Sequence, residues 1–125
     1  MRALVSVYDK ADLGPTLAAK LAPVLTGNRV TGWWWGHEHR AVAYGPSAGV
    51  RYPRCLGNGG VPTLPVPDPP ANSDPTVTWR STRTVKEDGQ ERLRFGFAVF
   101  DLHPDRIEIA YIDDDGATPH TETIT

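Results

Sequence analysis

The most informative segment of this chain reads Val30-Thr31-Gly32-Trp33-Trp34-Trp35-Gly36-His37-Glu38-His39-Arg40. Its first half is rich in β-branched and aromatic residues, which favour strands. Successive side chains of a strand point to opposite faces, so the three consecutive tryptophans place bulky apolar groups on both faces. A strand of this kind is normally covered on both sides by other layers. The range 29–40 is therefore predicted to form a buried strand that ends at Gly36 and runs into a turn.

This turn carries two histidines, His37 and His39, separated by a single residue. Side chains at positions i and i+2 of a strand point to the same side, and in a tight turn they can converge. Neutral imidazole is a common ligand for zinc, iron and manganese. Gly36 would let the backbone turn sharply beside a metal. The pair predicts a metal site, and two solvated histidines in a turn are the alternative.

A helix is predicted before this strand, over about residues 12–26. Asp12 can cap its amino end, and Pro15 suits its first turn. The apolar positions recur every four residues, as in an amphipathic helix, at Leu13, Leu17, Leu21 and Leu25. Pro23 is expected to disturb the end of the helix, and Gly27 is a stop signal.

Two further regions follow the histidine turn. The range 57–76 is rich in glycine and proline, so we expect a long loop without a helix or a central strand. A loop of this length within a compact domain is usually functional or a linker. The tail, residues 77–124, is predicted to be β-rich. Its strands are expected in three segments joined by polar turns: Val77 to Val85, Leu93 to Asp101 and Arg106 to Ile112.

The composition is that of a single globular domain, 1–125. Hydrophobic residues make up 39% and charged residues 22% of the chain, which argues against general disorder. A net charge of -2 offers no broad attraction for nucleic acid or for an anionic membrane. The single cysteine, Cys55, excludes an internal disulfide, and no apolar run reaches the roughly 20 residues that span a membrane. We therefore expect a cytoplasmic protein in which Cys55 is a packed side chain.

The segment around the two histidines closely resembles the last metal-binding block of calcineurin-like metallophosphoesterases. In that family an apolar strand, often with an aromatic residue before the glycine, runs into G-H-x-H. Residues 6–9 are similar to the stretch that precedes this block, and residues 54–62 to the glycine-rich segment that follows it. Residues 95–101 and 106–113 are similar to the closing strands of one bacterial group. The chain thus resembles the carboxy-terminal portion of such a domain over nearly its whole length.

The resemblance implies a phosphatase that hydrolyses phosphate esters with two divalent or trivalent metal ions, Mn, Fe or Zn. Two such ions clamp the phosphoryl group, generate a hydroxide and neutralise the leaving oxygen. Carried over, His37 would bind one metal and His39 the other, with Glu38 facing away or supporting the ligands. The implied fold class is α/β, here the C-terminal part of a two-sheet β-sandwich flanked by helices, with one main helix followed mostly by strands.

Most of the family's other ligands are absent from the chain. Its earlier blocks read D-x-H, G-D-x-x-D and G-N-H-E/D, and a lone histidine precedes G-H-x-H. G-D-x-x-D does not occur, and Gly57-Asn58-Gly59 lacks the histidine and the acid that should follow the asparagine. A catalytic zinc alone usually has three protein ligands, so two histidines do not make a dinuclear site. We expect a truncated product, a misassigned start or one piece of a split enzyme, which needs the missing N-terminal half or self-association.

A D-x-H sequence does occur out of order, at Asp101-Leu102-His103. Circular permutation would make Asp101 and His103 metal ligands, but a polar turn between two strands is the simpler interpretation, which Pro104 favours. The run Asp113-Asp114-Asp115-Gly116 lacks the rest of a calcium-binding loop and is predicted to be a solvated hairpin turn. His120 lies in a polar tail and is predicted to be exposed.

Two other functions stay open from the sequence. The chain could be a non-catalytic β-rich interaction module whose exposed aromatic strand forms a partner surface, with the histidines incidental. It could also be a mononuclear metal-binding domain completed by ligands from a second copy.

A fragment of such a domain is predicted to behave poorly when made alone. The tryptophan strand would lose its neighbours, and each exposed large side chain forgoes about 1.5–3 kcal/mol of burial. An uncovered sheet edge also invites self-association. We expect an oligomer or poor solubility in size-exclusion chromatography, and a monodisperse monomer that melts cooperatively would contradict this prediction.

Overall fold

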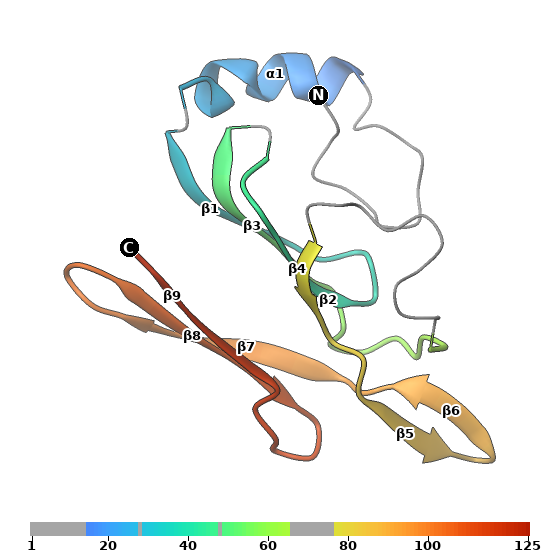
Figure 1. The fold of residues 1–125 in the computed structure, drawn as a ribbon. Helices are drawn as coiled ribbons and strands as arrows, with labels where there is room; N and C mark the ends of the chain where they lie inside the picture. Colours follow the sequence, from blue (N-terminus) through green and yellow to red (C-terminus); the bar gives the residue numbers. More distant parts are fainter. Residues whose placement is uncertain (1–14, 28, 48, 66–76) are drawn as a thin grey trace.

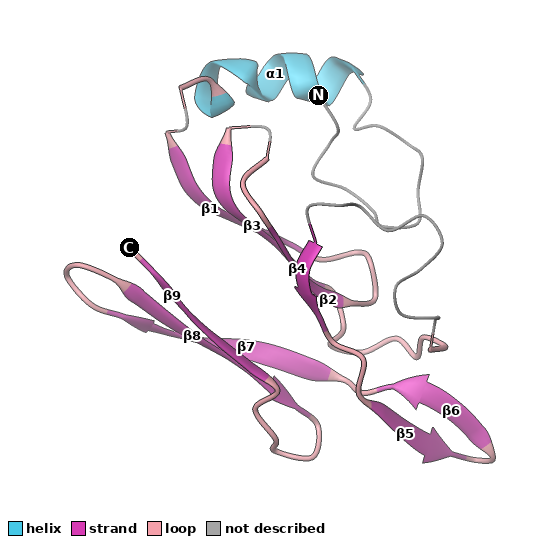
Figure 2. Ribbon diagram, viewed as in Figure 1, coloured by secondary structure: helices cyan, strands magenta, loops and turns pink. Residues whose placement is uncertain are grey.

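The structure is a computed structural model that describes residues 15–27, 29–47, 49–65 and 77–125. Within these ranges the chain forms one helix, α1 (Pro15–Leu25), followed by strands that group into three sheets. In Figure 1, α1 and a three-stranded sheet lie on opposite sides of a four-stranded sheet, and Figure 2 shows how strongly strands dominate the described part. The architecture fits the predicted β-rich α/β class.

Helix α1 matches the predicted helix over the residues that the structure describes, and residues 12–14 lie outside them. The helix continues for two residues past Pro23, so the proline does not end it. Proline frees the carbonyl four residues earlier, here that of Ala19, and Ala19 is exposed, so water can replace the missing donor. Gly27 then adopts a φ of 80°, the left-handed conformation in which many helices end.

The larger sheet contains β1 (Val30–Trp35), β2 (Ala41–Tyr44), β3 (Val50–Leu56) and β4 (Val77–Arg80), in the order β1-β3-β2-β4. Strands β1 and β3 are parallel, whereas β2 is antiparallel to both of its neighbours. The sequence does not predict β3, because proline within a run argues against a central strand. Pro53 nevertheless lies opposite Trp33, fully buried, and its carbonyl accepts a hydrogen bond from Arg54 Nη1 at 2.8 Å.

The tryptophan strand β1 is covered on both faces, as predicted. Trp33 and Trp35 pack against the buried cluster that contains Leu25 of α1. Trp34 faces the other way and meets the Phe100 ring edge to face, with the ring centroids 5.3 Å apart. All three tryptophans are half-buried, so the exposed aromatic strand expected for an interaction module is not found in β1.

The tail forms a hairpin and a second sheet. The hairpin strands are β5 (Thr84–Glu87) and β6 (Gln90–Leu93), and the sheet strands are β7 (Gly96–Leu102), β8 (Ile107–Asp113) and β9 (His120–Ile124). The hairpin turns at Asp88 and Gly89, which both have positive φ, as a two-residue turn requires. The segment predicted as one strand from Val77 to Val85 is divided between β4 and β5, and the one from Leu93 to Asp101 is divided between β6 and β7. Strand β9 was not predicted.

The three-stranded sheet faces the four-stranded sheet across one apolar cluster. Its centre is formed by the buried side chains of Ile109, Tyr111 and Ile124. Four large side chains of the other sheet pack against this centre: Trp34, Tyr52, Leu56 and Trp79. The alternation of apolar residues in β8 that the sequence shows therefore marks the face turned toward the four-stranded sheet.

A buried ion pair also joins the two sheets. Arg54 of β3 donates from Nε to Glu122 Oε1 of β9 at 2.8 Å, and the Tyr111 hydroxyl donates to the same oxygen at 2.6 Å. His120 lies beside this group and stacks on Trp79, with ring centroids 4.4 Å apart. The prediction that His120 is exposed is wrong, because this long-range contact half-buries the ring, and burial lowers the pKa of its imidazole.

Residues 57–65 form neither helix nor strand, as predicted for the glycine- and proline-rich loop, and residues 66–76 lie outside the described ranges. No helix among the described residues has the length and apolar character needed to cross a membrane.

Candidate metal centre at the end of strand β1

The histidine turn lies where the parallel strands β1 and β3 end side by side. Trp35 pairs with Cys55 at this end, and the Gly57 amide donates to the Arg40 carbonyl at 2.8 Å. A Cβ atom on Gly57 would lie 1.6 Å from the Glu38 carbonyl oxygen, so the approach is possible only for glycine. The carboxyl ends of parallel strands are where open α/β sheets bind their ligands.

His37 carries an unusual backbone conformation, with a φ of 75°. The bend predicted at Gly36 is therefore found one residue later. After this bend, the Glu38 carbonyl accepts a hydrogen bond from the Arg40 amide at 2.7 Å within the turn and lies against Gly57, which directly follows β3. A left-handed conformation outside glycine costs about 1–3 kcal/mol and is concentrated at functional sites. The strain at His37 thus marks this turn as a candidate site.

Both candidate ligands are accessible. His37 and His39 are exposed, whereas Glu38 between them is half-buried. The carbonyl of His39 accepts a hydrogen bond from Thr63 Oγ1 at 3.2 Å, which ties the following loop to the turn. The backbone of the turn is therefore held by β3 and by this loop, while the two imidazoles stay available to a metal ion.

Cys55 is fully buried beneath the turn and approaches the carbonyls of Arg40 and Glu38, with Sγ–O distances of 3.4 and 3.6 Å. Burial, and after it the charge of Glu38, raises the pKa of the Cys55 thiol to about 12. The thiol is therefore protonated at neutral pH, and a protonated thiol is neither a good nucleophile nor a metal ligand. The prediction that Cys55 is a packed side chain is confirmed.

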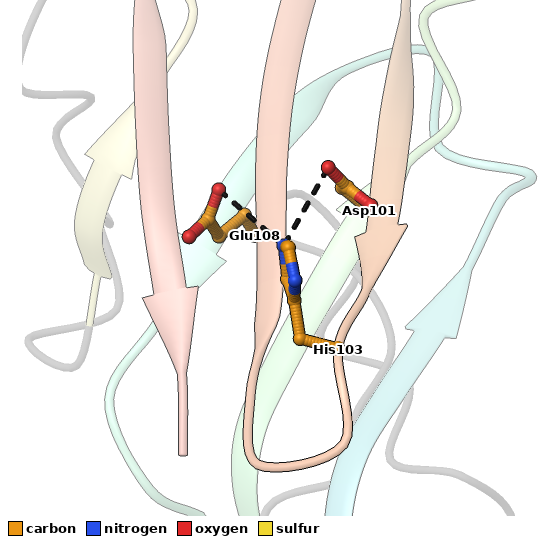
Figure 3. A group of neighbouring side chains, drawn as sticks. All are labelled: Asp101, His103 and Glu108. Atoms are coloured by element: carbon orange, nitrogen blue, oxygen red, sulfur yellow. Dashed lines mark ion pairs between the residues drawn. The ribbon is translucent and has the colours of Figure 1, made fainter.

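His37 and His39 do not gather a third ligand among the described residues. In the described ranges, one group of three or more His, Cys, Asp or Glu side chains lies close enough together to share an ion, and it is Asp101, His103 and Glu108 (Figure 3). The D-x-H sequence supplies two of its members. The sequence reasoning missed Glu108, whose only signal is its position opposite Asp101 in the β7–β8 register.

The acidic turn after β8 is occupied by arginines. Arg83 donates from Nη1 to Asp113 Oδ2 at 2.7 Å and from Nη2 to Asp115 Oδ2 at 2.8 Å, and Arg94 Nη1 donates to Asp114 Oδ1 at 2.7 Å. Hydrogen bonding from Arg83 lowers the pKa of Asp115 to about 2. Asp113 is buried, so the prediction of a solvated turn is wrong at this residue. These carboxylates anchor the turn through ion pairs.

Comparison of the chain with protein-family models found no match, and comparison with curated proteins found none. A function for the chain therefore has to be inferred from the chemistry of its described side chains.

Proposed function

We propose that the chain is the carboxy-terminal part of a metal-dependent phosphoesterase of the calcineurin-like type, with His37 and His39 as ligands to two metal ions, Mn, Fe or Zn. The observation that carries this proposal is the strained, exposed histidine turn at the carboxyl end of a parallel strand. In the complete domain the two facing sheets would belong to a two-sheet β-sandwich flanked by helices. We propose a cytoplasmic enzyme with a phosphate ester as its substrate.

The imidazole groups of His37 and His39 are suitable ligands for these ions, but they supply only some of the ligands that two ions need. Imidazole nitrogen suits manganese, iron and zinc, yet a single catalytic zinc already takes three protein ligands. The remaining ligands would come from polypeptide beyond the described residues, either the N-terminal half of the domain or a second copy of the chain.

Two indole groups support a larger assembly around β1. Nε1 of Trp34 and Nε1 of Trp35 are shielded from solvent and make no hydrogen bond within the described part of the chain. A buried donor without an acceptor costs about 1–3 kcal/mol. In a complete domain, rearrangement of these side chains against additional polypeptide would give the indoles acceptors, and the same polypeptide would supply ligands to the metals.

When bound, two metal ions supply Lewis acidity and an activated water for hydrolysis of the ester. The contribution of this chain is to position the ligands. Strand β3 fixes the turn through the close contact between Gly57 and the Glu38 carbonyl, and Thr63 holds the His39 backbone. A rigid scaffold that presents a functional loop at a strand end is a common arrangement for catalysis.

The proposal predicts that hydrolysis by the complete enzyme needs both histidines. The coding sequence upstream of Met1 would be expressed in frame with this chain, and Mn²⁺-dependent hydrolysis of p-nitrophenyl phosphate would be measured. Even groups that only support a metal ligand are worth about 10–100-fold in activity, so His37→Ala and His39→Ala should each reduce the rate by ~100-fold or more. Lys86→Ala changes an exposed residue of the β5–β6 hairpin that belongs to neither group of candidate ligands; it serves as the control and should leave the rate unchanged.

Two results would count against the phosphoesterase. The first is an upstream frame without a lone histidine preceded by G-N-H-E/D, G-D-x-x-D and D-x-H. The second is a metal-dependent rate that survives in the double variant His37→Ala, His39→Ala.

A non-catalytic interaction module is the second candidate, and strand β7 favours it. Phe97 and Val99 are 57% and 46% exposed, although both are large and apolar, and they lie on the face of β7 turned away from the four-stranded sheet. Contiguous exposed apolar side chains mark surfaces that bind other proteins. Under this alternative, partner binding would survive replacement of both turn histidines and would be lost on changing Phe97 and Val99 to serine.

A further inference from the structure

Three side chains with metal-ligating atoms meet at the turn of the β7–β8 hairpin. Asp101 lies directly opposite Glu108 in the antiparallel register, so the two carboxylates project from the same face. His103 follows Asp101 by two residues, and Figure 3 shows its imidazole between the carboxylates. Its Nε2 atom lies 3.5 Å from Asp101 Oδ2 and 3.7 Å from Glu108 Oε2.

The hairpin fixes the backbone that carries this group. The His103 amide donates to the Arg106 carbonyl at 2.9 Å and so closes a two-residue connection that begins with Pro104, whose ring fixes φ. Arg106 Nε donates to Glu108 Oε1 at 2.7 Å, and the other oxygen of Glu108, Oε2, is the one nearer His103. Arg106 therefore holds the Glu108 carboxylate in place beside His103.

Residues 101–108 carry three carboxylates and one guanidinium group. Two carboxylates placed directly opposite each other on antiparallel strands repel and destabilise the pair. Asp105 adds a third carboxylate, and Arg106, the guanidinium in this turn, pairs with Asp105 and Glu108. The turn therefore keeps a negative surplus on the face where Asp101 and Glu108 project.

The distances from His103 Nε2 to the two carboxylates match those between ligands of one metal ion and are too long for hydrogen bonds between charged groups. His103 Nε2 is shielded from solvent and makes no hydrogen bond within the described residues. A hydrogen bond between charged groups would bring nitrogen and oxygen to about 2.7–2.9 Å. Two ligands that each lie about 2.1 Å from a tetrahedral zinc ion are ~3.4 Å apart, close to the separations found here.

We propose that Asp101, His103 and Glu108 form a site for one divalent transition-metal ion, with Zn²⁺ as the best fit. One nitrogen and two carboxylate oxygens are typical zinc donors, and three protein ligands leave a fourth position for water or for a group from a partner. The ion would link β7 to β8 across the turn and would turn the repulsion between the carboxylates into attraction. The site is separate from the histidine turn of β1 and does not rest on the phosphoesterase proposal.

Zinc titration of the full-length chain tests this site directly. The double variant His37→Ala, His39→Ala removes the other histidine pair and is the background for the measurement. Isothermal titration with ZnCl₂ at neutral pH should show one ion bound per chain, and adding His103→Ala should weaken binding at least tenfold. Asp101→Asn and Glu108→Gln keep the shape of each side chain and should also weaken binding about tenfold or more, as loss of a ligand charge requires.

Asp105→Asn is the matched control, because it removes a carboxylate from the same turn without removing a ligand, and affinity should change little. Addition of zinc should also shift the ring nitrogen resonances of His103 in an NMR spectrum. The proposal is overturned if the background chain binds no zinc, or if His103→Ala and Asp101→Asn both bind zinc as tightly as the background. Circular dichroism would confirm that each variant is folded. If His103→Ala does not fold, the shape-conserving variants Asp101→Asn and Glu108→Gln test the proposal in its place.

Discussion

Replacement of Glu122 by alanine is expected to lower the free energy of unfolding by about 3–5 kcal/mol, the usual cost of leaving one member of a buried ion pair alone. The Arg54 side chain is only 6% exposed and that of Glu122 12% exposed, so water cannot take over the role of the carboxylate. The two residues lie on β3 and β9, which belong to different sheets. Urea unfolding followed by circular dichroism would measure the loss.

Two control variants separate charge from packing. The double variant Arg54→Met, Glu122→Met removes both charges at similar volume and should be less destabilising than Glu122→Ala, because an apolar pair often replaces a buried ion pair at little cost. Tyr111→Phe removes only the hydroxyl that donates to Glu122 and should cost about 1 kcal/mol. A loss below ~1 kcal/mol for Glu122→Ala would show that this ion pair does not hold the sheets together.

The pH dependence of stability is a second readout of the same pair. Burial acts to raise the pKa of Glu122, but the hydrogen bonds from Arg54 and Tyr111 outweigh burial and lower it. The folded carboxylate therefore binds protons less readily than the unfolded one, whose pKa is about 4.3. The stabilisation is complete above that pH and is lost as the pH falls through the folded pKa. The melting temperature should thus fall in acid, and less steeply in Glu122→Gln.

Local signals in the sequence were sufficient for α1, for β1 and for the hairpin turn at Asp88 and Gly89. Periodicity, residue type and turn chemistry act over a few neighbouring residues, and so they can be read without the fold. Strand β3 escaped prediction because Pro53 breaks a local rule, and only burial between two strands explains why it is tolerated.

The candidate sites divide in the same way. His37 and His39 are adjacent in the sequence and could be predicted, whereas the third member of the hairpin group, Glu108, is brought to Asp101 by strand register. The exposure of His120 was misjudged because stacking on Trp79 is a contact between different sheets, which no local pattern shows. Long-range pairing therefore limits what the sequence alone can predict about a site.

The second large effect is expected for Gly57→Ala, which adds one methyl group beneath the histidine turn. Its Cβ would lie 1.6 Å from the carbonyl oxygen of Glu38 and 2.6 Å from the carbonyl carbon. Both are backbone atoms, so no side chain can rotate away and the turn itself must move. Overpacking of a close contact costs about 1–3 kcal/mol and occasionally more, and the backbone clash places this variant at the upper end. Urea unfolding would measure the destabilisation.

Gly36→Ala is the matched control at the other end of the same turn. No atom lies within 4 Å of a Cβ on Gly36, and its φ is not positive, so alanine should change the free energy of unfolding by no more than about 0.5 kcal/mol. Glu38 lies between His37 and His39, so movement of its carbonyl also displaces the two imidazoles. Gly57→Ala should therefore weaken metal binding at the proposed site of His37 and His39, and Gly36→Ala should not. Equal stability of the two variants would show that the turn does not pack on the end of β3. A destabilised Gly57→Ala protein with unchanged metal affinity would instead separate the fold of the turn from the proposed site.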